Sequence, residues 1–241
     1  MTSFDNPGHV LITGASSGIG AALACAYAAP GRRLSLGGRN AAHLDEVATA
    51  CRASGALCET RQTDVTDRES MTAWIAEADA EQALDLVVAN AGISGGTIKL
   101  GNAPDASDAE IFATNVDGTV NTLEPALAGM LPRNAGQVAI VSSLASFRAF
   151  GEAPAYCASK AAVRFYGEGL QRAHRRSAVG ISVICPGFVR SPMTDANNFR
   201  MPMLMDTDVA AHRIVSGLAH GRSRIAFPLS LYVGIRMLSL I

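Results

Sequence analysis

The stretch "HVLITGASSGIG", residues 9–20, runs from an apolar segment directly into a glycine-rich turn. Its first five residues are strand-like, and Gly14, Gly18 and Gly20 follow before a segment of helical character. Glycine permits a tight reversal of the chain, and it lets backbone N–H groups at a helix N-terminus approach a bound pyrophosphate. The alternative for such glycines is an ordinary structural turn. Because this turn links a strand to a helix, the stretch predicts the start of a βαβ unit with an anion-binding turn.

The rest of the chain repeats this alternation of short apolar runs and helix-length segments. Runs such as "LVVAN" (86–90) and "VAIVSS" (138–143) are apolar on both faces, which is typical of parallel strands between two helical layers. Asp67 and Asp206 are candidate helix N-caps. The sequence therefore predicts an α/β fold, a Rossmann-type doubly wound parallel sheet of about seven strands with helices on both faces. The predicted strands are 9–13, 33–38, 57–62, 84–90, 136–143, 180–186 and 224–228. The predicted helices are 18–29, 40–54, 67–80, 105–130, 154–176 and 206–219.

Composition excludes several classes of protein. With 241 residues, 49% of them hydrophobic and 17% charged, the chain has the composition of a globular protein, and we expect a single domain over 1–241. A net charge of -1 provides no basic surface for nucleic acid. The five histidines show no metal-ligand spacing, so we expect no metal site. The five cysteines include no Cys-x-x-Cys, and the N-terminal residues do not resemble a signal peptide, so we expect free thiols and a cytoplasmic location.

Four motifs together resemble the classical short-chain dehydrogenase/reductase family. They are "TGASSGIG" (13–20), "NAG" (90–92), "YCASK" (156–160) and "PG" (186–187), in this order. The resemblance extends over nearly the whole chain. It implies a dinucleotide-binding domain and an NAD(P)-dependent oxidoreductase that interconverts a ketone and a secondary alcohol of a small or apolar substrate. Ligands of such sheets bind beyond the carboxyl ends of the strands, which is where these motifs fall.

The resemblance also implies which residues hold the cofactor. Asp64 and Val65, after the third predicted strand, would meet the adenine ring, and Asn90 and Gly92 would lie beside the ribose and pyrophosphate. Taken from the residues alone, Asp64 and Asn90 are equally compatible with helix caps or turns. The candidate cofactor-binding residues are Gly14, Ser16, Ser17, Gly18, Ile19, Gly20, Arg39, Asp64, Val65, Asn90, Ala91, Gly92, Tyr156, Lys160, Pro186, Gly187, Val189 and Ser191.

The end of the second predicted strand, "SLGGRN" (35–40), indicates which cofactor binds. An acid at this point accepts the ribose hydroxyls of NAD, whereas an arginine accommodates the phosphate of NADP. Gly38 stands where the family's NAD-type acid would fall, and Arg39 follows it. A guanidinium suits a phosphate dianion, so NADP (NADPH) is favoured over NAD. Against this, Arg39 is one of many arginines, and Ser17 replaces the basic residue that precedes Gly18 in many NADP-dependent relatives.

"YCASK" carries Tyr156 and Lys160 at positions i and i+4, hence on one face of a helix. Lys160 is one of only two lysines, whereas the other 18 basic residues are arginines. By resemblance, Tyr156 is the general acid and base. The Lys160 ammonium would lower the phenol pKa from its usual ~10 and would also bond the nicotinamide ribose.

Two further residues complete the catalytic set by resemblance. Ser143, thirteen residues before Tyr156, would donate a hydrogen bond to the substrate oxygen, whereas Ser142 is left with a strand-end role. Asn115, in "TNVDG", would hold a water that links Lys160 to solvent. The alternative for Asn115 is an ordinary polar residue of a helix.

Two segments near the C-terminus remain less defined. The methionine-rich segment within 188–208 suits either a lid over an apolar substrate or packing on the core or a neighbouring subunit. The apolar run 225–241 contains a proline, a glycine and an arginine, which makes it a poor membrane span. It predicts a last strand and a helix packed on the protein or a subunit, while peripheral membrane contact and a truncated chain remain open.

Three classes of function compete for this sequence. The leading one is an NADP-dependent oxidoreductase. The second, a nucleotide-binding sensor of the same fold without turnover, gives no reason for the serine, tyrosine and lysine together. The third, a methyltransferase, predicts an acid after the second strand and gives no reason for Tyr-x-x-x-Lys. By analogy with the family we expect a homodimer or homotetramer; the substrate and the physiological direction are not encoded in these motifs.

Overall fold

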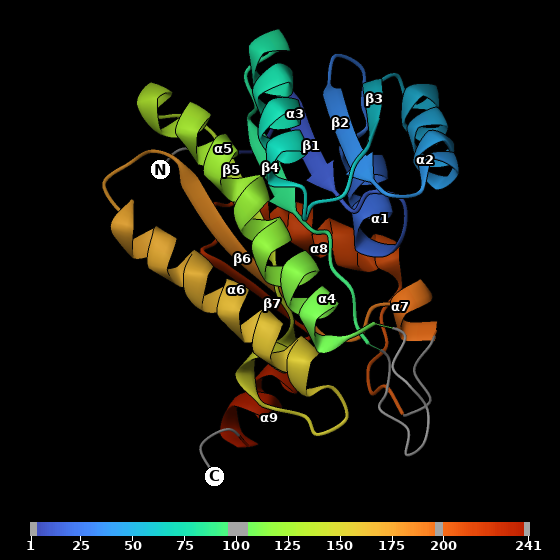
Figure 1. Cartoon of the computed structure of the whole chain (residues 1–241), viewed down its shortest axis with the longest axis vertical. Helices are drawn as coiled ribbons and strands as arrows, with labels where there is room; N and C mark the ends of the chain where they lie inside the picture. Colours follow the sequence, from blue (N-terminus) through green and yellow to red (C-terminus); the bar gives the residue numbers. More distant parts are fainter. Residues whose placement is uncertain (1–3, 96–105, 196–199, 239–241) are drawn as a thin grey trace.

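The computed structural model describes residues 4–95, 106–195 and 200–238 (Figure 1). Seven strands form one sheet in the order β3-β2-β1-β4-β5-β6-β7, and every neighbouring pair is parallel. The predicted fold class is therefore confirmed. The strands are β1 (His9–Thr13), β2 (Arg33–Gly38), β3 (Leu57–Gln62), β4 (Leu86–Ala89), β5 (Gln137–Val141), β6 (Gly180–Pro186) and β7 (Arg224–Phe227).

Helices cover both faces of this sheet; in Figure 1, α5 and α6 lie in front of it and α8 behind it. The helices are α1 (Gly18–Tyr27), α2 (Ala41–Ala53), α3 (Arg68–Glu81), α4 (Asp108–Phe112), α5 (Gly118–Arg133), α6 (Pro154–Ala173), α7 (Pro192–Asp195), α8 (Thr207–Ala219) and α9 (Leu229–Leu238). A π-helical turn, Ala113–Asp117, joins α4 to α5, and a 3-10 turn, Leu144–Phe147, follows β5.

Adjacent residues of the central strands enter two different cores. Ile12 of β1 packs in a cluster with residues of α1, α2 and α8, whereas Leu11 packs in a cluster with residues of α3, α5 and α6. Val88 and Val87 of β4 divide in the same way. This two-sided burial explains why the strands are continuous apolar runs instead of alternating ones.

Local side chains define several helix ends. The Asp67 carboxylate accepts a hydrogen bond from the Ser70 N–H, so its predicted role as the N-cap of α3 is confirmed. Asp206 precedes α8 but makes no side-chain cap. Asp206 is thus the N-cap residue, as predicted, but its carboxylate accepts from Arg190 Nε at 3.0 Å and not from the helix backbone.

The predicted helix 105–130 also differs from the structure. Residue 105 lies outside the described residues, and helical structure begins at Asp108, with α4, the π-helical turn and α5 in succession. The C-terminal run forms β7 and α9, as expected, and Ile235 of α9 is buried while Leu229, Val233 and Met237 are exposed. Within the described residues, no helix has the length and apolar character needed to cross a membrane.

Candidate active site

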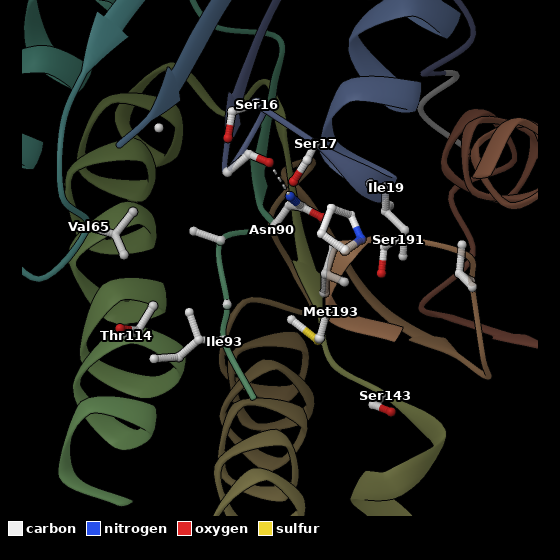
Figure 2. A pocket seen from close by; sticks show the side chains of 18 of the residues that line it. Ser16, Ser17, Ile19, Val65, Asn90, Ile93, Thr114, Ser143, Ser191 and Met193 are labelled. Carbon is white, nitrogen blue, oxygen red and sulfur yellow. Dashed lines mark hydrogen bonds between the residues drawn. The ribbon is translucent and has the colours of Figure 1, made fainter. Parts of the chain in front are cut away.

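A pocket of about 370 Å³ opens along the carboxyl edge of the sheet. Figure 2 shows Ser16 and Ser17 at one end of it and Ser143 at the other, with Met193 in between. The parallel strands end at this edge, so residues far apart in the sequence meet there. All predicted site residues line the pocket except Gly20 and Asn115.

The glycine-rich turn forms one wall of the pocket. Gly14 and Gly18 have φ values of 64° and 53°, which glycine adopts without strain. A Cβ on Gly20 would lie 2.2 Å from the Gly14 carbonyl oxygen, so Gly20 lets α1 begin close behind the turn without itself lining the pocket. Ser17, at the N-cap of α1, makes no side-chain cap. The first N–H groups of α1 are therefore available to an anion in the pocket, which is the role that a pyrophosphate requires.

Asn90 ties this turn to the end of β4. Its Nδ2 donates to the carbonyl oxygens of Thr13 at 2.9 Å and Gly14 at 3.1 Å. In return, Thr13 Oγ1 accepts from the N–H groups of Asn90 and Ala91. The amide of Asn90 therefore binds the protein's own backbone, and its side chain lies against the wall of the pocket (Figure 2).

The far end of the pocket, beyond β2 and β3, carries opposite charges. Arg39 lines it with an exposed side chain, and its guanidinium makes no hydrogen bond or ion pair with any described residue. Asp64 is the only carboxylate in the described lining. One of its oxygens, Oδ1, accepts from the N–H and the hydroxyl of Thr66, both at 2.9 Å. The residues on either side of Arg39 at the end of β2 are Gly38 and Asn40, neither of which is acidic.

The sheet brings Ser143, Tyr156 and Lys160 together at the other end. The Ser143 and Tyr156 side chains both line the pocket, near enough for Ser143 to lower the pKa of the Tyr156 phenol. Lys160 Nζ lies 5.8 Å from the centre of the Tyr156 ring and donates to the Val141 carbonyl oxygen at 3.0 Å. Ser142 Oγ donates instead to the Lys160 carbonyl oxygen at 2.7 Å, which agrees with a strand-end role for Ser142. Polar groups from β5 and α6 thus converge at one point of the pocket.

Burial is the largest cause of the pKa shifts of Tyr156 and Lys160. It raises the pKa of the Tyr156 phenol, an effect that the hydrogen bond from Ser143 partly opposes. It also lowers the pKa of Lys160 to about 8. For the protein groups alone, burial outweighs the effect of Ser143 and the Tyr156 pKa is raised; the predicted lowering by Lys160 and the oxidised nicotinamide together stays a prediction.

Asn115 lies behind the pocket, fully buried in the π-helical turn. Its Oδ1 accepts from the Ile93 N–H at 2.8 Å, and its Nδ2 donates to the Ile93 carbonyl oxygen at 3.0 Å and to Ser159 Oγ at 2.9 Å. A Cβ on Gly92 would lie 3.0 Å from both Asn115 Oδ1 and Lys160 Nζ. Asn115 therefore holds the backbone after β4 in place, where Gly92 lies so close to Lys160 Nζ that a side chain at this position would be crowded.

The turn after β6 closes the pocket opposite α6. The Gly187 N–H donates to the Phe227 carbonyl oxygen at 2.7 Å, and Val189 pairs with Met205 in an isolated bridge. Of the methionine-rich segment, Met193 lines the pocket and Met205 packs on the core. The candidate lid 188–208 thus divides between the two alternatives; residues 196–199 lie outside the described residues.

Several lining residues were not assigned from the sequence. Most of them directly flank a motif residue, so adjacency to the motifs is the signal that would have found them. They are Gly38, Asn40, Thr63, Ile93, Thr114, Val141, Ser142, Pro192, Met193 and Thr194. Within the described residues, no group of histidines, cysteines and carboxylates could hold a metal ion.

Known proteins share both this sequence pattern and this fold. A sequence model described as short chain dehydrogenase matches residues 8–201. An uncharacterized oxidoreductase of Myxococcus xanthus (strain DK1622) is 40% identical over 228 residues, which cover 94% of this chain and 90% of that protein. A sepiapterin reductase of Chlorobaculum tepidum is 31% identical over 229 residues, which cover 89% of this chain and 91% of the reductase.

Solved structures agree with these relatives. A short chain dehydrogenase/reductase from Burkholderia phymatum, in complex with NAD, superposes with a TM-score of 0.87 at 25% identity, covering 98% of this chain and 94% of that one. A short-chain dehydrogenase from Sphingobium yanoikuyae, in complex with NADPH, shares the fold with a TM-score of 0.84 at 24% identity, covering 96% of this chain and 91% of that one.

Proposed function

Because this chain belongs to the short-chain dehydrogenase/reductase family and is thus an NAD(P)-dependent oxidoreductase, we propose that it interconverts a ketone and a secondary alcohol with NADP(H). One observation carries this proposal: Ser143, Tyr156 and Lys160 converge at the end of a pocket whose opposite wall is an anion-binding glycine turn. A binding protein without turnover has no need for such a trio beside the pocket.

The residues of the pocket suit a dinucleotide. The uncapped N-terminus of α1 and the turn from Gly14 to Ile19 would hold the pyrophosphate. Asp64 and Val65 would border the adenine, and Val189 and Ser191 the carboxamide end. When bound, the nicotinamide supplies or accepts the hydride.

The protein's own contribution is to hold and move a proton at the substrate oxygen. In reduction, Tyr156 gives its phenolic proton to that oxygen while the Ser143 hydroxyl donates a hydrogen bond to it. In oxidation, Tyr156 takes the proton back. Lys160, with a pKa lowered by burial to about 8, is able to exchange a proton near neutral pH and to donate to ribose hydroxyls.

Arg39 supports NADP(H) over NAD(H). Its exposed guanidinium lines the adenosine end of the pocket and is not engaged by a described acid, so it is available to a ribose phosphate. An acid after β2 would instead repel that phosphate, and this chain has Gly38 and Arg39 there.

The five free thiols suit the cytoplasm. Exposed Phe112 on α4 and Phe165 on α6 support assembly of a homodimer or homotetramer. We infer that residues 1–241 form one domain, which acts on a small or apolar ketone or alcohol.

The catalytic part is tested with Tyr156→Phe in a screen of ketones that follows NADPH oxidation. The variant should bind NADPH nearly as well as the wild type, by cofactor fluorescence, but reduce ketones about 10²- to 10⁴-fold more slowly. Tyr166→Phe, on the same helix but outside the pocket lining, is the matched control and should keep its rate. Full activity of Tyr156→Phe would refute the mechanism.

The cofactor preference is tested separately. Arg39→Ala should raise the KM for NADPH about tenfold and leave the KM for NADH little changed. Arg61→Ala, an exposed arginine at the end of β3 that pairs with Glu77, is the control for loss of charge alone. Equal effects of Arg39→Ala on both cofactors would refute the preference for NADP(H).

A further inference from the structure

Arg164 lies on the same side of α6 as Tyr156 and Lys160. It follows Lys160 by four residues, as Lys160 follows Tyr156, and this spacing places side chains one above the other along a helix. Arg164 is only 8% exposed, although it does not line the pocket. Its buried Nε has no hydrogen-bond partner among the described residues. Because burying a charged group is costly, the other contacts of the guanidinium must offset this cost.

The guanidinium of Arg164 binds the 3-10 turn that follows β5, Leu144–Phe147. Its Nη2 donates to the Ser146 carbonyl oxygen at 3.3 Å. Its Cζ lies 4.4 Å from the centre of the Phe147 ring and 4.5 Å from the centre of the Phe165 ring. A planar guanidinium stacks on a ring and donates from its edge at the same time, which an ammonium group cannot do. Arg164 therefore joins α6 to the end of this turn through two kinds of contact.

The Glu168 carboxylate holds the guanidinium in place. Glu168 Oε1 accepts from Arg164 Nη1 at 2.9 Å and from Arg224 Nη2 at 2.6 Å. From the other side, the Tyr232 ring meets the Phe147 ring edge-on, with 5.2 Å between their centres. The turn thus contacts both α6 and α9, which Figure 1 shows near one another. Loss of Arg164 alone leaves Glu168 paired with Arg224, so we expect the fold to survive it.

The same turn carries Ser143 as its N-cap. Ser143 Oγ accepts from the Ala145 N–H at 3.1 Å, and the Ser143 carbonyl oxygen accepts from the Ser146 N–H at 3.1 Å. A bond accepted from Ala145 uses a lone pair of the hydroxyl oxygen and not its proton, so that proton remains available to donate. The side chain and the main chain of Ser143 are both bound to the turn whose last residues Arg164 holds.

We propose that Arg164 is a positioning residue, which holds the turn Leu144–Phe147 where the Ser143 hydroxyl is aligned with the substrate oxygen. This inference rests on the proposed function, in which Ser143 donates a hydrogen bond to that oxygen. Arg164 acts only through the turn, since it does not line the pocket. The bond from Ser143 strengthens as negative charge develops on the oxygen, so a loss of its alignment should lower kcat and leave cofactor binding little changed.

The substitution Arg164→Met tests this role, because methionine keeps an unbranched apolar chain beside Phe147 and loses the charge and the donors. Turnover is followed as NADPH oxidation on a panel of apolar ketones that includes cyclohexanone and acetophenone, and the ketone that the wild type reduces fastest is the probe. We expect kcat to fall about tenfold, whereas the Kd for NADPH should stay within about twofold of the wild type.

The matched control is Arg133→Met on α5. Arg133 Nη1 pairs with Asp79 at 2.7 Å and its Nη2 donates to the Leu84 carbonyl oxygen at 2.8 Å, so it combines an ion pair and a backbone bond as Arg164 does. Arg133 is not part of the pocket lining or of the turn. Arg133→Met should therefore lose stability and keep its kcat.

A double-mutant cycle with Ser143→Ala separates positioning from a general loss of stability. Ser143→Ala alone should lower kcat about 10²-fold. If Arg164 acts through Ser143, adding Arg164→Met to Ser143→Ala should lower kcat by less than about twofold more. A tenfold loss in both backgrounds, or an unchanged kcat of Arg164→Met, would overturn the proposal. A wild-type kcat of Ser143→Ala, or no turnover with any ketone, would instead refute the proposed function, and this inference with it.

Amide hydrogen exchange tests the turn without a substrate. The N–H groups of Ala145 and Ser146 should exchange faster in Arg164→Met and at the wild-type rate in Arg133→Met, and unchanged exchange in Arg164→Met would contradict the proposal. If Arg164→Met does not fold, Arg164→Lys takes its place, because lysine keeps a cation opposite Glu168 without the flat fork. It should slow turnover when Ser143 is present and have no further effect when Ser143 is alanine; equal losses in both backgrounds would again overturn the proposal.

Discussion

Replacement of Asn115 by alanine tests whether a buried amide holds the cofactor pocket in shape. This side chain does not line the pocket. It accepts from the Ile93 N–H, donates to the Ile93 carbonyl oxygen and donates to Ser159 Oγ; the two bonds to Ile93 are called the clamp below. Ile93 follows Gly92, which approaches Lys160 closely. Loss of the clamp should therefore loosen the pocket wall next to the lysine as well as destabilise the fold.

The magnitude follows from the three hydrogen bonds lost. Each contributes about 1 kcal/mol net, so Asn115→Ala should lower the free energy of unfolding by about 3 kcal/mol. The Ile93 groups are partly reachable by water, which limits the further cost of leaving them unpaired. For a chain of this size the melting temperature should fall by roughly 6–12 °C.

Two measurements check this prediction. Urea unfolding gives the loss of stability, and NADPH fluorescence should show a Kd raised at least about fivefold, equivalent to about 1 kcal/mol. Ser159→Ala is the matched control, because it removes one bond to Asn115 and leaves the clamp on Ile93. Ser159 Oγ also donates to the Tyr156 carbonyl oxygen. The substitution Ser159→Ala should nevertheless lower the free energy of unfolding by only about 1–2 kcal/mol and leave the Kd for NADPH nearly unchanged.

A free energy of unfolding for Asn115→Ala within about 0.5 kcal/mol of the wild type, the range of ordinary surface substitutions, would refute a supporting role for this amide. A large loss of stability with an unchanged Kd for NADPH would refute the second half alone. In that case the clamp would support the fold without shaping the pocket.

Three further substitutions address other parts of the structure. Gly20→Ala puts a Cβ 2.2 Å from the Gly14 carbonyl oxygen, so it should cost about 1–3 kcal/mol in urea unfolding and weaken NADPH binding; unchanged binding would contradict the close approach of α1. Glu168→Gln removes the carboxylate that pairs with the buried Arg164 and should cost about 3 kcal/mol in urea, whereas a neutral result would show that the ion pair is dispensable. Burial lowers the pKa of His9 below 6.5, so the stability contributed by its neutral form is fully present above that pH and is lost as the pH falls. His9→Gln should therefore reduce the difference between the urea midpoints at about pH 7.5 and about pH 5.5, and an unchanged difference would refute this role of His9.

The sequence predicted the strands well because their burial on both faces leaves a strong pattern. Every predicted strand overlaps an observed one, and the chemistry-bearing residues fall at the strand ends, as the parallel arrangement requires. The helix expected over 105–130 was less well predicted. Its π-helical turn at Ala113–Asp117 adds no residue type that would mark it, since an extra backbone residue per turn is compatible with ordinary helix formers.

The direction of the Tyr156 pKa shift in the protein could not be predicted from the sequence either. Tyr156 and Lys160 four residues apart predict an electrostatic lowering of the phenol pKa, yet burial of Tyr156 acts in the opposite direction and prevails. Spacing along a helix fixes which side chains share a face, but it does not fix how much water reaches them, and that access decides the cost of a charge.

Thr13 supports the site through bonds to backbone atoms, a role that the sequence did not indicate. Thr13 Oγ1 accepts from the N–H groups of Asn90 and Ala91 and donates to the Val88 carbonyl oxygen. A backbone partner is present whatever residue stands at that position, so such a bond leaves no second residue type in the sequence to recognise. A tyrosine that moves a proton must be a tyrosine, whereas the role of a threonine that bonds the backbone of two strands is seen only in the folded geometry. Such a supporting role is therefore found only from the structure.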